Sequence, residues 1–527
     1  MSRGGAILLI SYLIPLAVVP TAVRLPLLLS VPRFTDETDE VMRGYAIYRG
    51  ELWPVTNVDA YVGPLWNYLL AGAFMLLGPS SRVPRGLVFL AGVATVAVTY
   101  LLARELARRA GISGVRITLV SGLATMLMAT SAVHSVVSSH VAWSHSLTPL
   151  LVTLGLWLLL RSGLDEVAPS DSHTSGPSGR DVVGAGLLLG LGVHTHPTVL
   201  ALVPGIAVWA VLRGRGCLRR GSTWLGVAAF LAANAPAIAF NLATGFQSFA
   251  EAQTVGTAYA GGRATDMPRY VQNLGLLLTS VPLLLGGGIG DRRGDFVGFD
   301  PILTALYGLP FLWGTVLCWR DGARLPAFAF GALALVLPAF NGKYEPLLNG
   351  RYLMPLVPLA TVCLAMGAVD AVTRARAVRG LRVLASGLPY LLMLLPTVSL
   401  AFYYRAVRLN GPSNDEWYAA RDLVVAARPR SPILVDASIS GTRVSSGRDG
   451  YGVLDFLLVL DGGLRVERVL PADLDRALSA STEPRLAALS SQAANRLSNS
   501  YRLRPVPGEE QERPKRRAGF GLWWVER

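Results

Sequence analysis

The residues best suited to proton-transfer chemistry form one short acidic cluster near the N-terminus. The cluster contains Asp36, Glu37, Asp39 and Glu40, directly after an apolar stretch. A carboxylate in such a place can act as a general base, and a well-placed base contributes roughly 10²–10⁴ in rate. A solvated charged loop has the same appearance, so charge alone leaves both interpretations open.

The residues after the cluster favour the functional interpretation. A helix-like segment, VMRGYAIYRG, occupies residues 41–50, and Trp53-Pro54 follows it. A further acid, Asp59, precedes Gly63-Pro64-Leu65, which begins an apolar helix. This order of acids, aromatic residues and turn residues predicts an organised loop over residues 31–85.

The elements that must position this loop are membrane-spanning helices. The chain has 527 residues, of which 52% are hydrophobic and only 16% charged, and its mean hydropathy is +0.44. A typical soluble domain has about 25% charged residues. Apolar runs close to the roughly 20 residues that cross a bilayer recur along the chain. They lie at 6–30, 86–103, 117–133, 146–161, 182–198, 199–213, 224–242, 302–319, 325–340, 352–371 and 383–403.

The positive charge gives these runs a direction. The net charge is +14, but the arginines stand in short clusters between apolar runs, which is typical of cytoplasmic loops and not of a nucleic-acid surface. Every arginine cluster lies on the cytoplasmic side if the N-terminus is cytoplasmic and all eleven apolar runs cross the membrane. Runs 64–78 and 272–288 are then interfacial or re-entrant helices. We therefore predict a multi-pass protein of the cell membrane, an all-α bundle of about 11–13 transmembrane helices.

The last part of the chain changes character. Residues 1–403 are predicted to form the transmembrane catalytic domain, and residues 404–527 a small soluble α/β domain outside the cytoplasm. Within it, residues 414–427 predict an amphipathic helix, and 432–439 and 456–460 predict strands. The final GFGLWWVER predicts an edge strand, with docking of Trp523 and Trp524 at the bilayer interface as the alternative.

Four motifs in order resemble the GT-C glycosyltransferases that use lipid-linked sugars, in particular the protein O-mannosyltransferase and aminoarabinose transferase relatives. The acidic pair Asp36-Glu37 stands at the family's spacing from Gly50, and Gly63-Pro64-Leu65-Trp66-Asn67-Tyr68 matches its helix opening. The later motifs are YLLARELARRAG at 100–111, GLGVHTHPT at 190–198 and GRYLMPLVPLA at 350–360. The resemblance covers about residues 6–370.

This chain departs from the family pattern at three places. Glu40 stands where the family usually has an aromatic residue, and Trp143-Ser144-His145 stands where many relatives have an acid. Asp59 has no lysine beside it.

The resemblance implies an inverting glycosyltransferase with a polyprenyl-phosphate-sugar donor, either hexosyl or pentosyl. The acceptor would be a protein, a lipid or a polysaccharide on the outer side of the membrane. Asp36 is the expected catalytic base, and Glu37 is the second candidate, as a catalytic group or one that orients the loop. No spacing predicts a metal site, and the resemblance leaves a divalent cation open as a cofactor.

Further substrate-binding candidates lie at the outer ends of spans. Arg351 suits a phosphate because its planar fork matches phosphate oxygens, and Lys343 lies in the same short loop. The alternative for Arg351 and Tyr352 is an interfacial anchor. The remaining candidates are His194, His196 and His145, which helix-packing hydrogen bonds could also explain, and Asp59 as a second acid or metal ligand.

Two other functions stay open at this stage. One is a transporter or flippase of lipid-linked glycans, which would need polar residues at mid-membrane, where the clear spans have few. The other is a non-catalytic membrane scaffold for cell-envelope assembly, with the C-terminal domain as its binding module.

Overall fold

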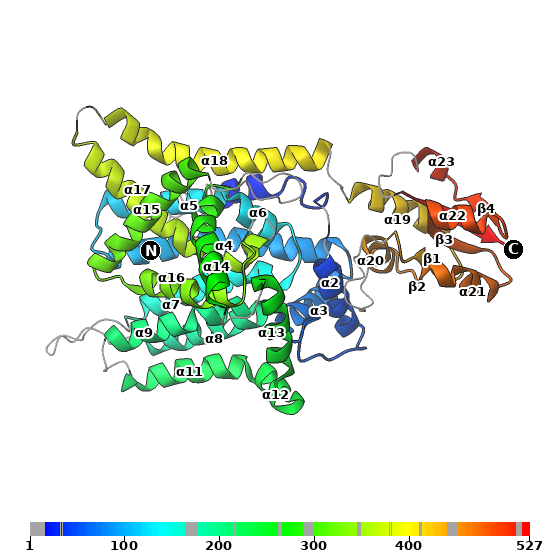
Figure 1. Cartoon of the computed structure of the whole chain (residues 1–527), viewed down its shortest axis with the longest axis horizontal. Coiled ribbons are helices and arrows are strands. Elements are labelled where there is room, and N and C mark those ends of the chain that lie inside the picture. The colour runs from blue at the N-terminus through cyan, green and yellow to red at the C-terminus, as the bar shows by residue number, and fades with distance from the viewer. Residues whose placement is uncertain are drawn as a thin grey trace.

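The protein has a helical bundle at one end and a small α/β domain at the other. The structure is a computed structural model that describes residues 16–31, 33, 35–163, 178–213, 218–261, 266–288, 300–344, 349–378, 380, 382–409, 414–439, 452–512 and 519–527. Helices α2 (Thr35–Tyr48) and α3 (Leu65–Leu77) lie at the end of the bundle that faces the α/β domain (Figure 1). The predicted outer loop therefore lies between the two parts of the molecule.

Most of the other helices of the bundle lie on the predicted apolar runs, whereas the helix over Gln247–Ala260 falls outside every predicted run. The first run, 6–30, falls partly outside the described residues, and residues 16–24 of it are helical. The helices are α4 (Arg82–Arg109), α5 (Val115–Thr130), α6 (Ala132–Ser139), η1 (Ser144–Leu147), α7 (Thr148–Arg161), α8 (Gly179–Thr195), η2 (Pro197–Ala201), α9 (Val203–Arg213), α11 (Gly221–Ala233), α12 (Ala235–Thr244), α13 (Gln247–Ala260), α14 (Met267–Leu285), α15 (Pro301–Arg320), α16 (Leu325–Val336), η3 (Leu337–Ala339), η4 (Asn349–Leu353), α17 (Val357–Ala375) and α18 (Arg382–Leu409).

Not every apolar helix is long enough to cross a membrane alone. Among the described residues, α4, α15, α17 and residues 385–405 of α18 meet the requirement by length and composition. The bent pairs α5–α6 and α11–α12 meet it as pairs, which makes up to six candidate spans. The predicted class, a helical membrane bundle with a small C-terminal α/β domain, is confirmed. The total of about 11–13 spans stays a prediction.

Small residues let the central helices pack closely. A Cβ on Gly314 of α15 would lie 1.8 Å from the carbonyl oxygen of Cys363, and one on Gly367 of α17 would lie 1.9 Å from that of Pro310. Close backbone approach over glycine is typical of helix pairs in membranes, where dispersion contacts replace the hydrophobic effect. α17 is therefore a closely packed central helix that begins just after η4 and ends at the far end of the bundle.

The α/β domain is built on a five-stranded mixed sheet with strand order β2-β1-β3-β5-β4. β1 pairs in parallel with β2 and β3, and β5 pairs antiparallel with β3 and β4. Its elements are α19 (Asp415–Ala427), β1 (Ile433–Asp436), α20 (Val453–Leu460), β2 (Val466–Val469), η6 (Pro471–Asp473), α21 (Leu474–Ser479), β3 (Arg485–Ser490), α22 (Ser491–Leu497), β4 (Arg502–Pro505), α23 (Glu509–Glu512) and β5 (Phe520–Glu526).

The sequence located some of these elements correctly and others wrongly. The helix at 414–427 and the strand within 432–439 are confirmed as α19 and β1. The strand at 456–460 is wrong, because these residues lie in α20; a short run of apolar residues does not distinguish a buried strand from a buried helix. The final strand is β5, which is paired on both sides and is therefore not an edge. The predicted domain boundary at 403/404 falls inside α18, which continues to Leu409.

Buried polar contacts join the α/β domain to the α2 end of the bundle. Asp461 accepts hydrogen bonds from the backbone N–H and the hydroxyl of Ser81, both at 2.7 Å, and from Arg421 Nη1. Arg33 Nη2 donates to Tyr418 Oη at 3.0 Å. Because these groups are largely removed from water, the junction holds the loop that carries Asp36 against the α/β domain.

Candidate active site

The candidate site begins with Asp36, in the first turn of α2. Its side chain is 53% exposed, and its Oδ2 lies 3.7 Å from Arg351 Nη1. Arg351 belongs to η4, more than 300 residues further along the chain, so the fold brings the predicted base and the predicted phosphate ligand together. A carboxylate and a guanidinium side by side can take a proton and stabilise a departing phosphate.

Arg351 is held in one orientation by aromatic side chains. Its guanidinium lies 4.9 Å from the ring centre of Trp143 and 5.0 Å from that of Tyr352. Arg351 Nη2 donates to the Tyr352 hydroxyl at 2.9 Å, while Arg351 Nε is buried with no hydrogen-bond partner among the described residues. Nε and Nη1 lie on opposite sides of a guanidinium, so Arg351 faces Asp36 on one side and keeps a buried, unpaired N–H on the other.

A chain of rings extends from Arg351 into the bundle. Trp143 stacks on His145 with ring centres 5.0 Å apart, and His145 lies 4.1 Å from His196. His196 lies 5.5 Å from Tyr352. Burial, with His196 and Arg351 nearby, holds the pKa of His145 well below its usual value, so this imidazole is neutral. The rings therefore present an aromatic, uncharged wall beside Arg351.

Lys343 adds a second cation to the same wall. Its Nζ lies 4.3 Å from the ring centre of Tyr259, and Tyr259 lies 6.0 Å from Tyr352. The predicted residues Asp36, Arg351, Tyr352, Lys343, His145 and His196 thus form a single group. A negatively charged ligand with a ring-shaped part would find both charge and stacking surfaces there.

Glu37 occupies a different environment from its neighbour Asp36. Its carboxylate is fully buried, and its oxygens accept from Arg33 Nη1 at 2.8 Å, Arg85 Nε at 2.6 Å and Arg85 Nη2 at 2.7 Å. With both oxygens bound by arginines, Glu37 cannot reach an acceptor hydroxyl. Of the two roles expected from the sequence, its position suits orientation of α2 and not proton transfer.

Asp59 and His194 lie at the edge of the group. Asp59 Oδ2 accepts from the Tyr61 hydroxyl at 3.3 Å. The backbone N–H of Gly63 donates to the His194 carbonyl at 2.9 Å, and a Cβ on Gly63 would lie 2.3 Å from His194 Nδ1. Gly63 therefore allows the loop to pack closely against the end of α8. His194 and His196 have different surroundings because α8 ends at Thr195, between them.

Glu40 is a residue of the site whose role the sequence did not reveal. Its Oε2 accepts from the Ser144 backbone N–H at 2.7 Å, and its Oε1 accepts from the Ser144 hydroxyl at 3.1 Å. Burial raises the pKa of Glu40 to about 8, and the nearby carboxylate of Asp36 adds to the rise. Glu40 thereby fixes the turn that carries Trp143 and His145. The available signal was its position, one helical turn after Asp36 on the same face of α2.

The described residues contain no group of three or more His, Cys, Asp or Glu side chains arranged to hold a metal ion. The divalent cation that the sequence left open therefore stays a prediction.

Comparisons with known proteins support the fold. No protein-family model and no curated protein sequence matches the chain. The crystal structure of ArnT from Cupriavidus metallidurans in the apo state is similar, with a TM-score of 0.54 and 13% identity over 99% of this chain and 97% of ArnT. The same protein bound to undecaprenyl phosphate gives a TM-score of 0.54 and 15% identity over 99% and 98% of the two chains. The chain therefore has the GT-C fold that its motifs predicted.

Proposed function

We propose that the protein is an inverting glycosyltransferase of the cell membrane. It transfers a sugar from a polyprenyl-phosphate-linked donor to an acceptor on the extracytoplasmic side. The observation that carries this proposal is the pairing of Asp36 with Arg351 beside the wall formed by Trp143, His145, His196 and Tyr352. The N-terminus lies in the cytoplasm and the α/β domain outside in this proposal, as the arginine clusters require.

The reaction assigns one task to each side chain. The acceptor hydroxyl attacks the anomeric carbon, and Asp36 takes its proton as the new C–O bond forms. The bond from the anomeric carbon to the phosphate oxygen breaks, and the electron pair leaves with the polyprenyl phosphate. Arg351 stabilises that charge through Nε, on the side of its guanidinium away from Asp36, so base and leaving group are kept apart. The configuration at the anomeric carbon is inverted.

The donor assignment rests on fold and charge together. ArnT, which shares the fold, has been crystallised with undecaprenyl phosphate. In this chain Arg351 and Lys343 supply two cations beside aromatic rings, which suits a phosphate next to a sugar. The acceptor and the class of sugar, hexose or pentose, are for the assay to determine.

Two carboxyl groups support the reaction without touching substrate. Glu40 positions the Trp143–His145 turn through Ser144, and Glu37 anchors α2 to Arg33 and Arg85. Asp36 and Glu40 stand one turn apart on α2 but in contrasting environments, one exposed and one buried. Environments that separate two carboxyl groups in this way are typical of sites where one acts as a base and the other stays protonated.

The test is transfer from radiolabelled polyprenyl-phosphate sugars by the purified full-length protein in lipid vesicles. Asp36→Asn should lower the rate of sugar transfer by a factor of roughly 10²–10⁴. Its unfolding midpoint and its affinity for the donor should not change. Glu51→Gln is the matched control, because Glu51 is an exposed acid in the same loop and pairs with exposed Arg49. Full transfer by Asp36→Asn would remove the assignment. Repeating the transfer assay with a metal chelator tests whether a divalent cation is needed.

A further inference from the structure

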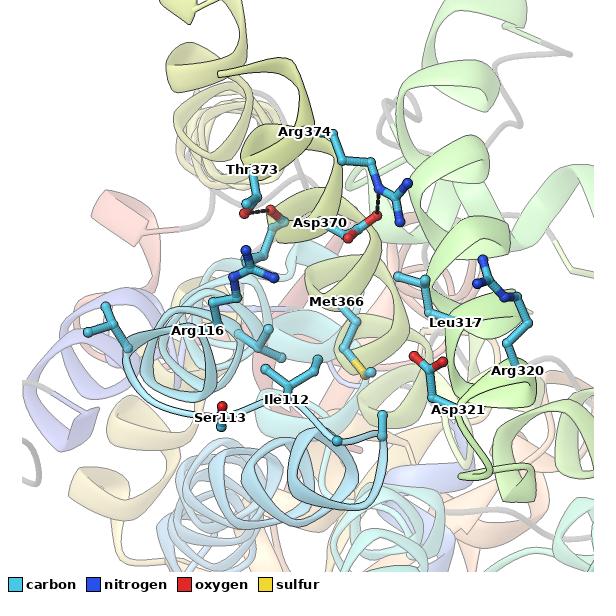
Figure 2. A pocket seen from close by; sticks show the side chains of 15 residues that line it. Ile112, Ser113, Arg116, Leu317, Arg320, Asp321, Met366, Asp370, Thr373 and Arg374 are labelled. Carbon is cyan, nitrogen blue, oxygen red and sulfur yellow. Dashed lines mark hydrogen bonds and ion pairs between the residues drawn. The ribbon is translucent and has the colours of Figure 1, made fainter. Parts of the chain in front are cut away.

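The other end of the bundle contains a cavity that the proposed reaction does not use. It has a volume of about 430 Å³ and lies between the end of α4, the start of α5, the end of α15 and the last turns of α17 (Figure 2). Arg85, near the start of α4, contacts Glu37 at the Asp36 end, whereas Ala110, just after α4, lines the cavity. A helix of 28 residues is roughly 42 Å long, so the two sites lie at opposite ends of a helix long enough to cross a membrane.

The charges of the cavity do not all neutralise one another. Arg374 Nε pairs with Asp370 at 2.7 Å, and Asp370 also accepts from the indole of Trp313. Within the described part of the chain, Arg116 and Arg320 have no ion pair, and their side chains project from opposite walls (Figure 2). With Asp321 as the second carboxylate, three arginines and two aspartates give the lining a formal charge of +1.

The start of α5 strengthens the preference for an anion. This 16-residue helix begins after Gly114, which offers no side-chain cap to the N–H groups of the first turn. The positive end of the helix dipole therefore lies at the cavity wall that carries Arg116. The negative ends of α15 and α17 meet the same space, but Arg320 and Arg374 stand in their last turns and offset them.

Apolar side chains form the buried part of the cavity. Val120 of α5 and Met366 of α17 are fully buried there, while Arg116 and Arg320 are exposed at the rim. The arginines come from clusters that the sequence assigned to cytoplasmic loops. Basic pockets between transmembrane helices on that side are typical binding sites for lipid head groups.

We propose that this cavity binds a phosphate ester, with Arg116 and Arg320 contacting the phosphate. A phosphodiester carries one negative charge at neutral pH and so balances the formal charge of the lining. The same chemistry is offered by the head group of an anionic membrane lipid and by a soluble phosphate ester. The proposal does not depend on glycosyl transfer, because no residue of the Asp36 site takes part.

The experiment measures binding to the purified full-length protein in detergent. The probes are dioctanoyl phosphatidylglycerol, glycerol 3-phosphate, and dioctanoylglycerol, which has the same chains as the first but no phosphate. Arg116→Gln and Arg320→Gln should each weaken phosphatidylglycerol binding by about tenfold or more, since each removes a charged hydrogen-bond donor. Arg104→Gln is the matched control, because Arg104 is an exposed arginine near the same end of α4 that does not line the cavity.

The outcomes distinguish a membrane lipid from a soluble phosphate ester, and other outcomes overturn the proposal. Tight binding of phosphatidylglycerol alone, lost in both cavity variants, identifies a membrane lipid. Equal binding of glycerol 3-phosphate with the same dependence identifies a soluble ester. The proposal is overturned if dioctanoylglycerol binds as well as phosphatidylglycerol, if Arg104→Gln weakens binding as much as the cavity variants, or if neither cavity variant has an effect.

Discussion

The two ends of the helical bundle use charged residues in opposite ways. At the Asp36 end, Glu37 and its partners Arg33 and Arg85 have no exposed side-chain surface. At the cavity end, Arg374 is 63% exposed and pairs with Asp370 in a single ion pair. Burial strengthens electrostatic interactions and makes an unpaired group costly, whereas exposure weakens both effects. Arginines and acids therefore hold side chains in fixed positions at the Asp36 end, whereas at the cavity end their side chains are free to change partners.

The largest effect should come from breaking the buried group at the Asp36 end. Glu37→Ala leaves Arg33 and Arg85 buried without their carboxylate, and removing one partner of a buried pair costs about 3–5 kcal/mol. Unfolding in mixed micelles should show this loss of stability. A loss below about 1 kcal/mol, comparable with that of an exposed pair, would mean that Glu37 does not anchor α2.

Arg351→Gln should show that polyprenyl phosphate binds at the Asp36 end of the bundle. Loss of a charged donor to phosphate is worth about 1.5–3 kcal/mol, so binding of polyprenyl phosphate should weaken roughly 10- to 100-fold. Arg104→Gln, at the other end and outside the cavity, should leave this binding unchanged. Titration of both variants with a fluorescent polyprenyl phosphate measures the difference. The comparison between the ends fails if the two variants behave alike.

Glu40 should give the Asp36 end a characteristic pH dependence. Burial raises its pKa to about 8 from 4.5, so the folded state keeps a proton that the unfolded state loses above about pH 4.5. Stability should therefore fall as the pH rises from about 4.5 to 8. Glu40→Gln keeps an acceptor for the Ser144 N–H and should not show this component. Unfolding midpoints at pH 5 and pH 8 measure it, and equal pH slopes in the two proteins would contradict a buried, protonated Glu40.

The smallest effect is expected at the cavity end. Arg374→Gln removes an exposed ion pair, and such pairs contribute about 0.2–1 kcal/mol. The same unfolding assay should detect little change, in contrast to Glu37→Ala. A loss of several kcal/mol would show that the charges of the cavity are structural, and the contrast between the two ends would disappear.

The sequence was informative about the site where a motif implied a function. Asp36, Arg351, Tyr352, His145 and His196 were predicted from spacing, topology and resemblance, and the fold brings Asp36 close to Arg351. The contrast between Asp36 and Glu37 was not predictable, because adjacent residues on a helix point in different directions and their burial depends on distant segments. The arginines that bury Glu37 include Arg85, which is 48 residues away.

Two departures from the family pattern turn out to be connected. Glu40 and Trp143-Ser144-His145 are two of the places where the chain departs from the enzymes that its motifs resemble, and in the structure Glu40 hydrogen-bonds to Ser144. A contact across 104 residues cannot be inferred from one sequence. In the α/β domain, the run at 456–460 was misassigned for a local reason. Its pattern of apolar residues is compatible with both a helix and a strand.

The most direct test of the central claim is a density map of the protein with bound polyprenyl phosphate. The account predicts the phosphate against Arg351, within hydrogen-bond distance of Nε, with the lipid chain beside the bundle and an open space next to Asp36. A phosphate bound only between Arg116 and Arg320, with nothing at Arg351, would contradict it.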